Sequence, residues 1–124
     1  MIAFDGQSTT TQTTPHGSEQ SFMNIIFQQP ARATDEELAV LERLIQIAQE
    51  PTSGQSRRVA EFLLAWWDAP TFGGFNFSEA WGLDHQTTLD MAVVFSMITR
   101  IRVYPDQLGY APAFKKILAI WDQR

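Results

Sequence analysis

Cysteine is absent from this chain of 124 residues. Its absence excludes disulfide bonds and thiolate metal sites, and it is typical of a protein that works in a reducing cytoplasm. Histidine is scarce as well, with only two residues, His16 and His85. Because a protein metal site needs three or four convergent ligands, we expect neither a metal nor another cofactor.

Long apolar runs and an excess of positive charge are also missing. No run approaches the roughly 20 residues that span a bilayer, and the first residues lack the pattern of a signal peptide. The chain has nine Lys and Arg side chains and fourteen Asp and Glu side chains, which gives a formal net charge of −5. This charge opposes binding to a phosphate backbone and favours, at most, a basic protein partner. We therefore expect a cytoplasmic protein without membrane contact.

Aromatic residues are abundant, with nine Phe and four Trp, and 44% of the chain is hydrophobic. This composition supports one globular domain with an aromatic core. The first part of the chain differs, because residues 7–21 repeat Thr, Gln and Ser without an apolar side chain. We predict a flexible arm over residues 1–33 and a helical domain over residues 34–124. The apolar island at 22–27 either packs on the core or docks on a partner.

Capping residues and apolar spacing predict the first two helices of the domain. Thr34 and Glu37 form a capping box, and Pro51 ends the helix that they start. The second helix starts near residue 53 or 56, runs to about residue 68 and is closed by Pro70.

A third helix is predicted from Asp84, a good N-cap, to about Arg102. Between Leu89 and Ile101 it is apolar on nearly every side. A helix with apolar residues all round is usually buried all round, so we expect this helix to be central and enclosed by its neighbours.

The remaining elements are short. Within residues 71–83, Asn76 and Glu79 indicate a second capping box on a short helical turn, and Gly82 suits its C-terminal stop. Gly109 suits a positive φ in a tight connection, and Pro112 opens the last helix. The predicted fold is all-α: a compact orthogonal bundle of four main helices plus a short helical turn, with a disordered N-terminal arm.

Three segments carry a resemblance to a known family: GQSRRVAEFLLAWW (Gly54 to Trp67), GGFNFSEAWGLD (Gly73 to Asp84) and YPDQLGY (Tyr104 to Tyr110). Over roughly residues 38–121 the chain resembles a family of short, uncharacterised bacterial proteins carried on plasmids, phages and integrating conjugative elements. The resemblance implies a mobile-element protein of the bacterial cytoplasm, and it implies no activity or catalytic residue. Small acidic proteins of such elements often block a host complex, which is an analogy.

The start of the second helix holds the best polar cluster, with Gln55, Arg57 and Arg58 around Ser56. Free N–H groups and two guanidinium groups there suit an anion or a partner carboxylate. The alternative is structural: Ser53 or Ser56 caps the helix, and both arginines pair with acids elsewhere in the fold.

The aromatic residues near the end of this helix form a second candidate surface. Trp66 and Trp67 point about 100° apart on a helix, so one belongs to the core and the other packs under the following loop. That loop carries Phe72, Phe75, Phe77 and Trp81. The alternative to a small aromatic core is a partly exposed surface for a partner, formed by Trp67, Phe72 and Phe75.

Catalytic groups are poorly supported. Ser96, His85 and Asp90 form a triad only on paper, because no nucleophile-elbow context surrounds the serine. We expect the Ser96 hydroxyl to bond a backbone carbonyl inside the apolar third helix. Arg100 and Arg102 complement the dipole at the end of that helix, and they would join Arg57 and Arg58 in a basic patch only if the fold brought the pairs together.

The sequence thus predicts a non-enzymatic protein-interaction module of a bacterial mobile element, with an inhibitor of a host defence complex as its concrete form. The alternative is a nucleic-acid-associated accessory protein that uses an arginine patch. The predicted partner-binding residues are Arg57, Arg58, Gln55, Trp67, Phe72 and Phe75. A homodimer, through the island or a spare tryptophan, is left open.

Overall fold

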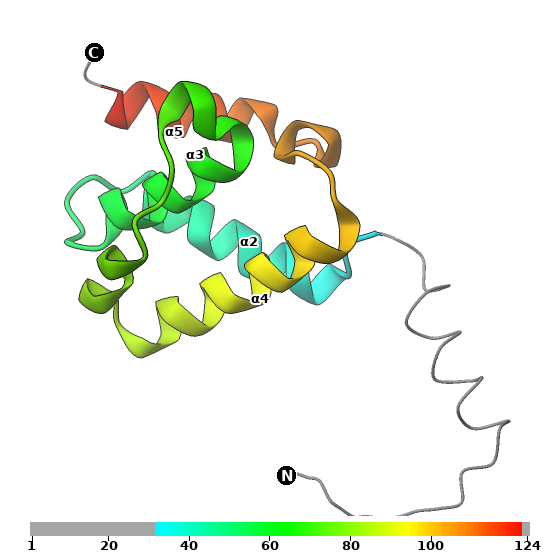
Figure 1. Ribbon diagram of the computed structural model, residues 1–124, viewed down its shortest axis with the longest axis horizontal. Coiled ribbons are helices and arrows are strands. Elements are labelled where there is room, and N and C mark those ends of the chain that lie inside the picture. Colours follow the sequence, from blue (N-terminus) through cyan, green and yellow to red (C-terminus); the bar gives the residue numbers. More distant parts are fainter. Residues whose placement is uncertain (1–31, 123–124) are drawn as a thin grey trace, which may run out of the picture. The chain divides into compact units, whose positions relative to one another are not determined.

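The computed structural model describes residues 32–122, and every regular element in that part of the chain is a helix (Figure 1). The elements are α2 (Asp35–Ala48), α3 (Ser56–Phe72), the 3-10 helix η1 (Phe77–Gly82), α4 (His85–Ile101), the 3-10 helix η2 (Pro105–Leu108) and α5 (Ala111–Trp121). The predicted all-α bundle is confirmed. The predicted arm, with its apolar island at 22–27, lies outside the described residues apart from positions 32 and 33.

The central helix of the bundle is α2, which contacts α3, α4 and α5. The expectation that α4 is the enclosed helix is wrong. Only one side of α4 faces the core, because α2 is its main helical neighbour, and Leu89, Val93 and Phe95 on its other side are exposed. The buried core draws on all four helices: Leu41, Leu44, Ile45, Ala48, Val59, Ala60, Leu63, Leu64, Met91, Val94, Met97, Ile101, Phe114 and Ile117.

Local capping starts α2 as predicted. The Thr34 hydroxyl oxygen accepts a hydrogen bond from the Glu37 backbone N–H at 3.1 Å, and the Glu37 carboxylate accepts one from the Thr34 N–H at 2.9 Å. These two bonds satisfy backbone donors that have no partner within the helix. The helix ends at Ala48, shortly before Pro51, in agreement with the sequence.

Helix α3 continues past the predicted stop at Pro70. Asp68 leaves helical geometry, with φ −163° and ψ 81°, and a further helical turn then runs to Phe72. The Asp68 carboxylate accepts a hydrogen bond from the Thr71 backbone N–H at 3.3 Å, as a capping residue does. Pro70 therefore lies in the first turn of a new helical segment, where proline is tolerated, and the chain kinks before it instead of ending there. Gly73, with φ 97°, ends the segment.

The later boundaries agree with the sequence. The Asp84 carboxylate caps α4 by accepting a hydrogen bond from the Thr87 N–H at 2.8 Å. Gly109 has φ 88°, which favours glycine, and Pro112 lies in the first turn of α5.

The capping pattern of η1 differs from the prediction. Asn76 caps it by accepting from the Ser78 N–H at 3.0 Å, but Glu79 points to the arginines of α3 and does not complete a capping box. Gly82 does not adopt a positive φ, so it is no left-handed stop. It is close to Arg58 instead: a Cβ at position 82 would lie 2.7 Å from Arg58 Cζ.

Aromatic rings and their polar atoms hold α5 against the other helices. Phe114 is fully buried, and its ring meets those of Trp66 and Trp67 edge-on at centroid distances of 5.8 and 5.9 Å. The Trp66 indole N–H donates to the Val103 carbonyl at 3.0 Å, and the Trp121 indole N–H donates to the Ala48 carbonyl at 2.6 Å. Both adjacent tryptophans thus pack on the core.

Candidate partner-binding surface

Gln55, immediately before α3, bonds to the residue that starts α4. Its side-chain amide donates to the Asp84 carboxylate at 2.9 Å, and its amide oxygen accepts from the Asp84 backbone N–H at 2.6 Å. The N–H and hydroxyl of Thr87, followed by the Gln55 amide, hold the pKa of Asp84 below its ordinary value. The two hydrogen bonds between Gln55 and Asp84 join the N-terminal end of α3 to that of α4, and η1 lies between these two helices in the sequence.

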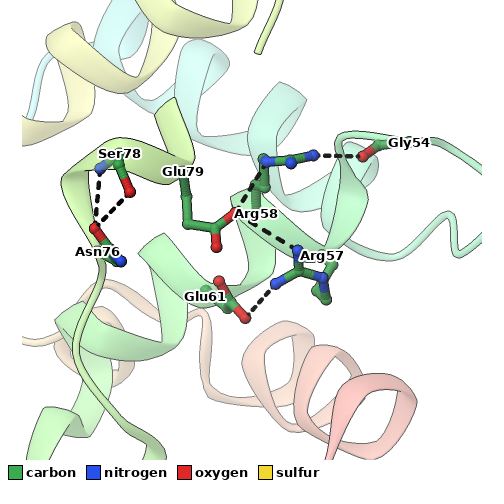
Figure 2. A network of polar contacts seen from close by, with 7 residues as sticks. All are labelled: Gly54, Arg57, Arg58, Glu61, Asn76, Ser78 and Glu79. Carbon is green, nitrogen blue, oxygen red and sulfur yellow. Dashed lines mark hydrogen bonds and ion pairs between the residues drawn. The ribbon is translucent and has the colours of Figure 1, made fainter. Parts of the chain in front are cut away.

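The two predicted arginines point to carboxylates of the same surface (Figure 2). Arg57 pairs with Glu61 one turn on, at 2.7 Å, and its second terminal nitrogen lies 3.5 Å from Glu79 Oε1. Arg58 Nε lies 3.0 Å from the same Glu79 oxygen without hydrogen-bond alignment, and its Nη1 donates to the Gly54 carbonyl at 3.3 Å. The Glu61 carboxylate, as the strongest partner, raises the pKa of Arg57. Both arginines therefore join α3 to η1 through Glu79.

Ser56 does not cap α3. It is fully buried, and its hydroxyl donates to the Glu50 carbonyl in the preceding connection. The Ser53 hydroxyl oxygen accepts from the Gln55 N–H at 3.2 Å. The members of the predicted polar cluster bond to other parts of the same chain, and both arginines pair with acids as the structural alternative expects.

The most exposed aromatic side chains of this region are on η1. Phe77 is 80% exposed and Trp81 is 88% exposed. The helix beneath them is fixed by the Asn76 cap at its start, by the Glu79 contacts to Arg57 and Arg58 in its middle, and by the Gln55–Asp84 bonds after its end. A short element with so little core contact is therefore held in one place by polar bonds.

The aromatic residues named from the sequence lie deeper. Trp67 packs on Phe72 at a centroid distance of 5.3 Å, and both are partly buried against the core. Phe75 meets Phe62 edge-on at 5.6 Å and lies 6.3 Å from Phe77. The sequence gives no local signal that separates exposed from packed rings in this loop, because the choice depends on which helix lies beneath each ring.

The second arginine pair is not part of this surface. The start of α3 and the end of α4 lie at opposite sides of the bundle (Figure 1). Arg100 makes a bidentate ion pair with Glu37, with nitrogen–oxygen distances of 2.6 and 2.7 Å. Arg102 is exposed, and it makes no ion pair within residues 32–122.

The three residues considered as a catalytic triad do not converge. His85 and Ser96 are eleven residues apart on α4, or roughly 16 Å along its axis. Asp90 is buried on the opposite side, where it accepts from Arg43 at 2.8 and 3.0 Å and from Gln86 at 2.9 Å. Ser96 is exposed, so its expected place inside an enclosed helix is wrong.

A depression of about 390 Å³ between α3 and α5 is lined by Arg57, Glu61, Phe72, Leu118 and Trp121. Its ionisable lining groups are Arg57, Glu61 and Asp122, of which Arg57 and Glu61 bond to each other. Within the described part of the chain, no three His, Asp or Glu side chains gather as a metal site would require. No helix over that same stretch combines the length and the apolar character of a membrane span.

Fold and surface together define a small helical domain that displays two aromatic side chains on a polar-bonded 3-10 helix. The model of the family of unknown function DUF7673 matches residues 38–122, so the chain belongs to that family. The match includes all three segments on which the sequence resemblance rested. No curated protein and no solved structure matches the chain.

Proposed function

We propose that this protein is a non-enzymatic protein-interaction module of a bacterial mobile element, acting in the cytoplasm through a docking surface centred on Phe77 and Trp81. One observation carries the proposal: these two rings are 80% and 88% exposed, although η1, which bears them, is fixed by ion pairs and caps.

Exposed tryptophan on a fixed element is suited to protein binding. Trp and Tyr dominate the energetics of protein interfaces because a large, stiff ring fills a pocket at little cost in side-chain entropy. A backbone that is already ordered avoids the further entropy loss that a flexible loop would incur on binding. The surface around Trp81 therefore has the properties of an interface centre before any partner is present.

Four of the six residues selected from the sequence serve this surface under the proposal. Gln55, Arg57 and Arg58 position η1 through Asp84 and Glu79, and Arg57 is also exposed enough to contact a partner at the rim. Phe75 adjoins the surface, with its ring 6.3 Å from that of Phe77, whereas Trp67 and Phe72 pack on the α5 side of α3 and are not part of it.

The partner that we propose is a protein with an apolar pocket and a basic rim. The apolar pocket would receive Trp81, and the basic rim would complement the net charge of −5 and the exposed Asp84 beside η1. A component of a host defence complex is the partner to test first, since the family resemblance implies a mobile-element protein. The titratable groups of this surface bond to one another, which favours binding over catalysis.

Affinity capture from bacterial lysate, followed by titration of the purified partner, tests the proposal. Trp81→Ala should weaken binding by roughly 30-fold or more, the loss expected for a central interface tryptophan. Tyr104→Ala is the matched control, because it removes an exposed aromatic side chain that lies outside η1 and outside α4. Circular dichroism should show both variants folded.

Glu79→Gln tests the positioning role separately. It removes the carboxylate that both arginines face and leaves Phe77 and Trp81 in place. We expect weaker partner binding and faster amide exchange in η1, with little change in thermal stability. A partner that binds Trp81→Ala as tightly as the wild type would refute the proposed surface.

A further inference from the structure

The outer face of α4 is apolar and has no neighbour among residues 32–122. Three large side chains lie on it, with Leu89 47%, Val93 38% and Phe95 55% exposed. At 100° per residue, the small exposed residues Ala92 and Ser96 lie between Leu89 and Val93 on one side and Phe95 on the other. Small side chains therefore form the middle of the face, and larger apolar ones lie on either side of them.

The middle of this face carries no charge; His85 and Arg100 lie on it at its two ends, and Arg100 is paired with Glu37. From Gln86 to Thr99 the only ionisable side chain is Asp90, and it is buried on the opposite side against Arg43. The charges lie at the two ends of the helix, with Asp84 exposed before its first residue and Arg102 exposed after its last. Arg102 makes no ion pair in the described structure.

We infer that this face binds a second copy of the chain, with the two α4 helices packed antiparallel about a two-fold axis near Ala92 and Val93. Asp84 and Arg102 each lie nine residues from Val93, so the antiparallel arrangement brings each carboxylate of one copy to the guanidinium of the other. A parallel arrangement would instead place like charges together. Opposed helix dipoles also favour the antiparallel pair.

The charge of the chain supports a second copy as the binding partner of this face. Each copy carries a net charge of −5, so two copies repel each other over most of their surfaces and can approach only on a neutral face. The face of α4 satisfies this condition. It also has an acid, Asp84, at one end and a base, Arg102, at the other, as a self-complementary two-fold interface requires. Residues 88–99 span about 18 Å, so the interface is small and the dimer is weak and concentration dependent.

The apolar face of α4 is separate from η1, although Asp84 borders both surfaces, and the inference does not depend on the proposed function. Sedimentation of the full chain over a range of concentrations should show a monomer–dimer equilibrium. Val93→Arg places a charge on the neutral face and should raise the dissociation constant at least tenfold. Trp81→Ala, the matched control on η1, should leave it unchanged. A wild type that stays monomeric, or a dimer that Trp81→Ala disrupts and Val93→Arg does not, would overturn the inference.

The absence of cysteine allows a test of the geometry that does not rely on a disruptive variant. In the antiparallel pair, Ala92→Cys places two thiols close to the axis, and mild oxidation should give a covalent dimer. Thr99→Cys lies on the same face two turns away, and its two copies would be about 20 Å apart, beyond disulfide reach. Equal cross-linking of the two variants, or none of either, would contradict the antiparallel pair.

Discussion

The ion pair between Glu37 and Arg100 joins the first turn of α2 to the last turn of α4, and its strength can be measured. The change that isolates it is Glu37→Gln. Glutamine can still accept the Thr34 N–H and complete the capping box, because Glu and Gln both serve at this position. What is lost is the negative charge, which lies 2.6 and 2.7 Å from the two terminal nitrogens of Arg100.

The expected magnitude follows from the pKa of Glu37. Hydrogen bonds from Arg100, with a smaller contribution from the Thr34 N–H, lower the pKa of this carboxyl from 4.5 to about 2 against the opposing effect of burial. At about 1.4 kcal/mol for each pKa unit, the shift corresponds to at most about 3.5 kcal/mol of stability. The Arg100 side chain is 34% exposed, and solvent screening reduces the expected value to about 1–2 kcal/mol.

The pH dependence has a definite sign. Because the folded-state pKa is lowered, the stabilisation is fully present above the unfolded pKa of 4.5 and declines as the pH falls toward about 2. Urea unfolding followed by tryptophan fluorescence would measure the free energy of unfolding of wild type and Glu37→Gln at several pH values. Glu36→Gln, an exposed position in the same turn, controls for the loss of charge near the helix start. A difference between wild type and Glu37→Gln that is equal at about pH 6 and about pH 3 would refute the assignment.

Three further changes test the packing and the other polar contacts. Ser56→Ala should lower the free energy of unfolding by about 1–3 kcal/mol in urea denaturation, because the Glu50 carbonyl loses its buried donor. Phe114→Ala should cost about 3–5 kcal/mol in the same assay, because it opens a cavity beneath two tryptophan rings. Burial, and then the hydrogen bond to Glu42, raise the pKa of Tyr110 to about 12, so Tyr110→Phe should remove the late step from a spectrophotometric titration. Because the folded-state pKa is raised, the stabilisation from the protonated Tyr110 hydroxyl is present below about pH 10 and is lost as the pH rises toward 12.

Helix boundaries were predictable wherever the signal is local. Thr34 with Glu37, Asp84, and Pro112 act within one turn, so their patterns are readable from neighbouring residues. The kink at Asp68 was not predictable, since a proline two residues later is compatible with either a stop or a restart. The openness of α4 was not predictable either, because apolar composition does not reveal how many neighbours a helix has.

The candidate surface was predictable in part for the same reason. Gln55, Arg57 and Arg58 stand out as a polar cluster at a helix start, but their partners Glu79 and Asp84 come more than twenty residues later in the sequence. Only the folded arrangement shows that this cluster holds η1 in place. The exposure of Phe77 and Trp81 follows from that arrangement, and it has no signature in the order of the aromatic residues.

The two indole hydrogen bonds make the bundle depend on contacts between distant parts of the chain. The carbonyl of Ala48, at the last turn of α2, accepts its donor from Trp121 in α5, and the carbonyl of Val103, just after α4, accepts one from Trp66 in α3. Until α5 docks on a growing chain, the Ala48 carbonyl at the end of α2 therefore lacks this donor. Cooperativity in this small domain is thus built into the hydrogen bonds at the helix ends as well as into the apolar core.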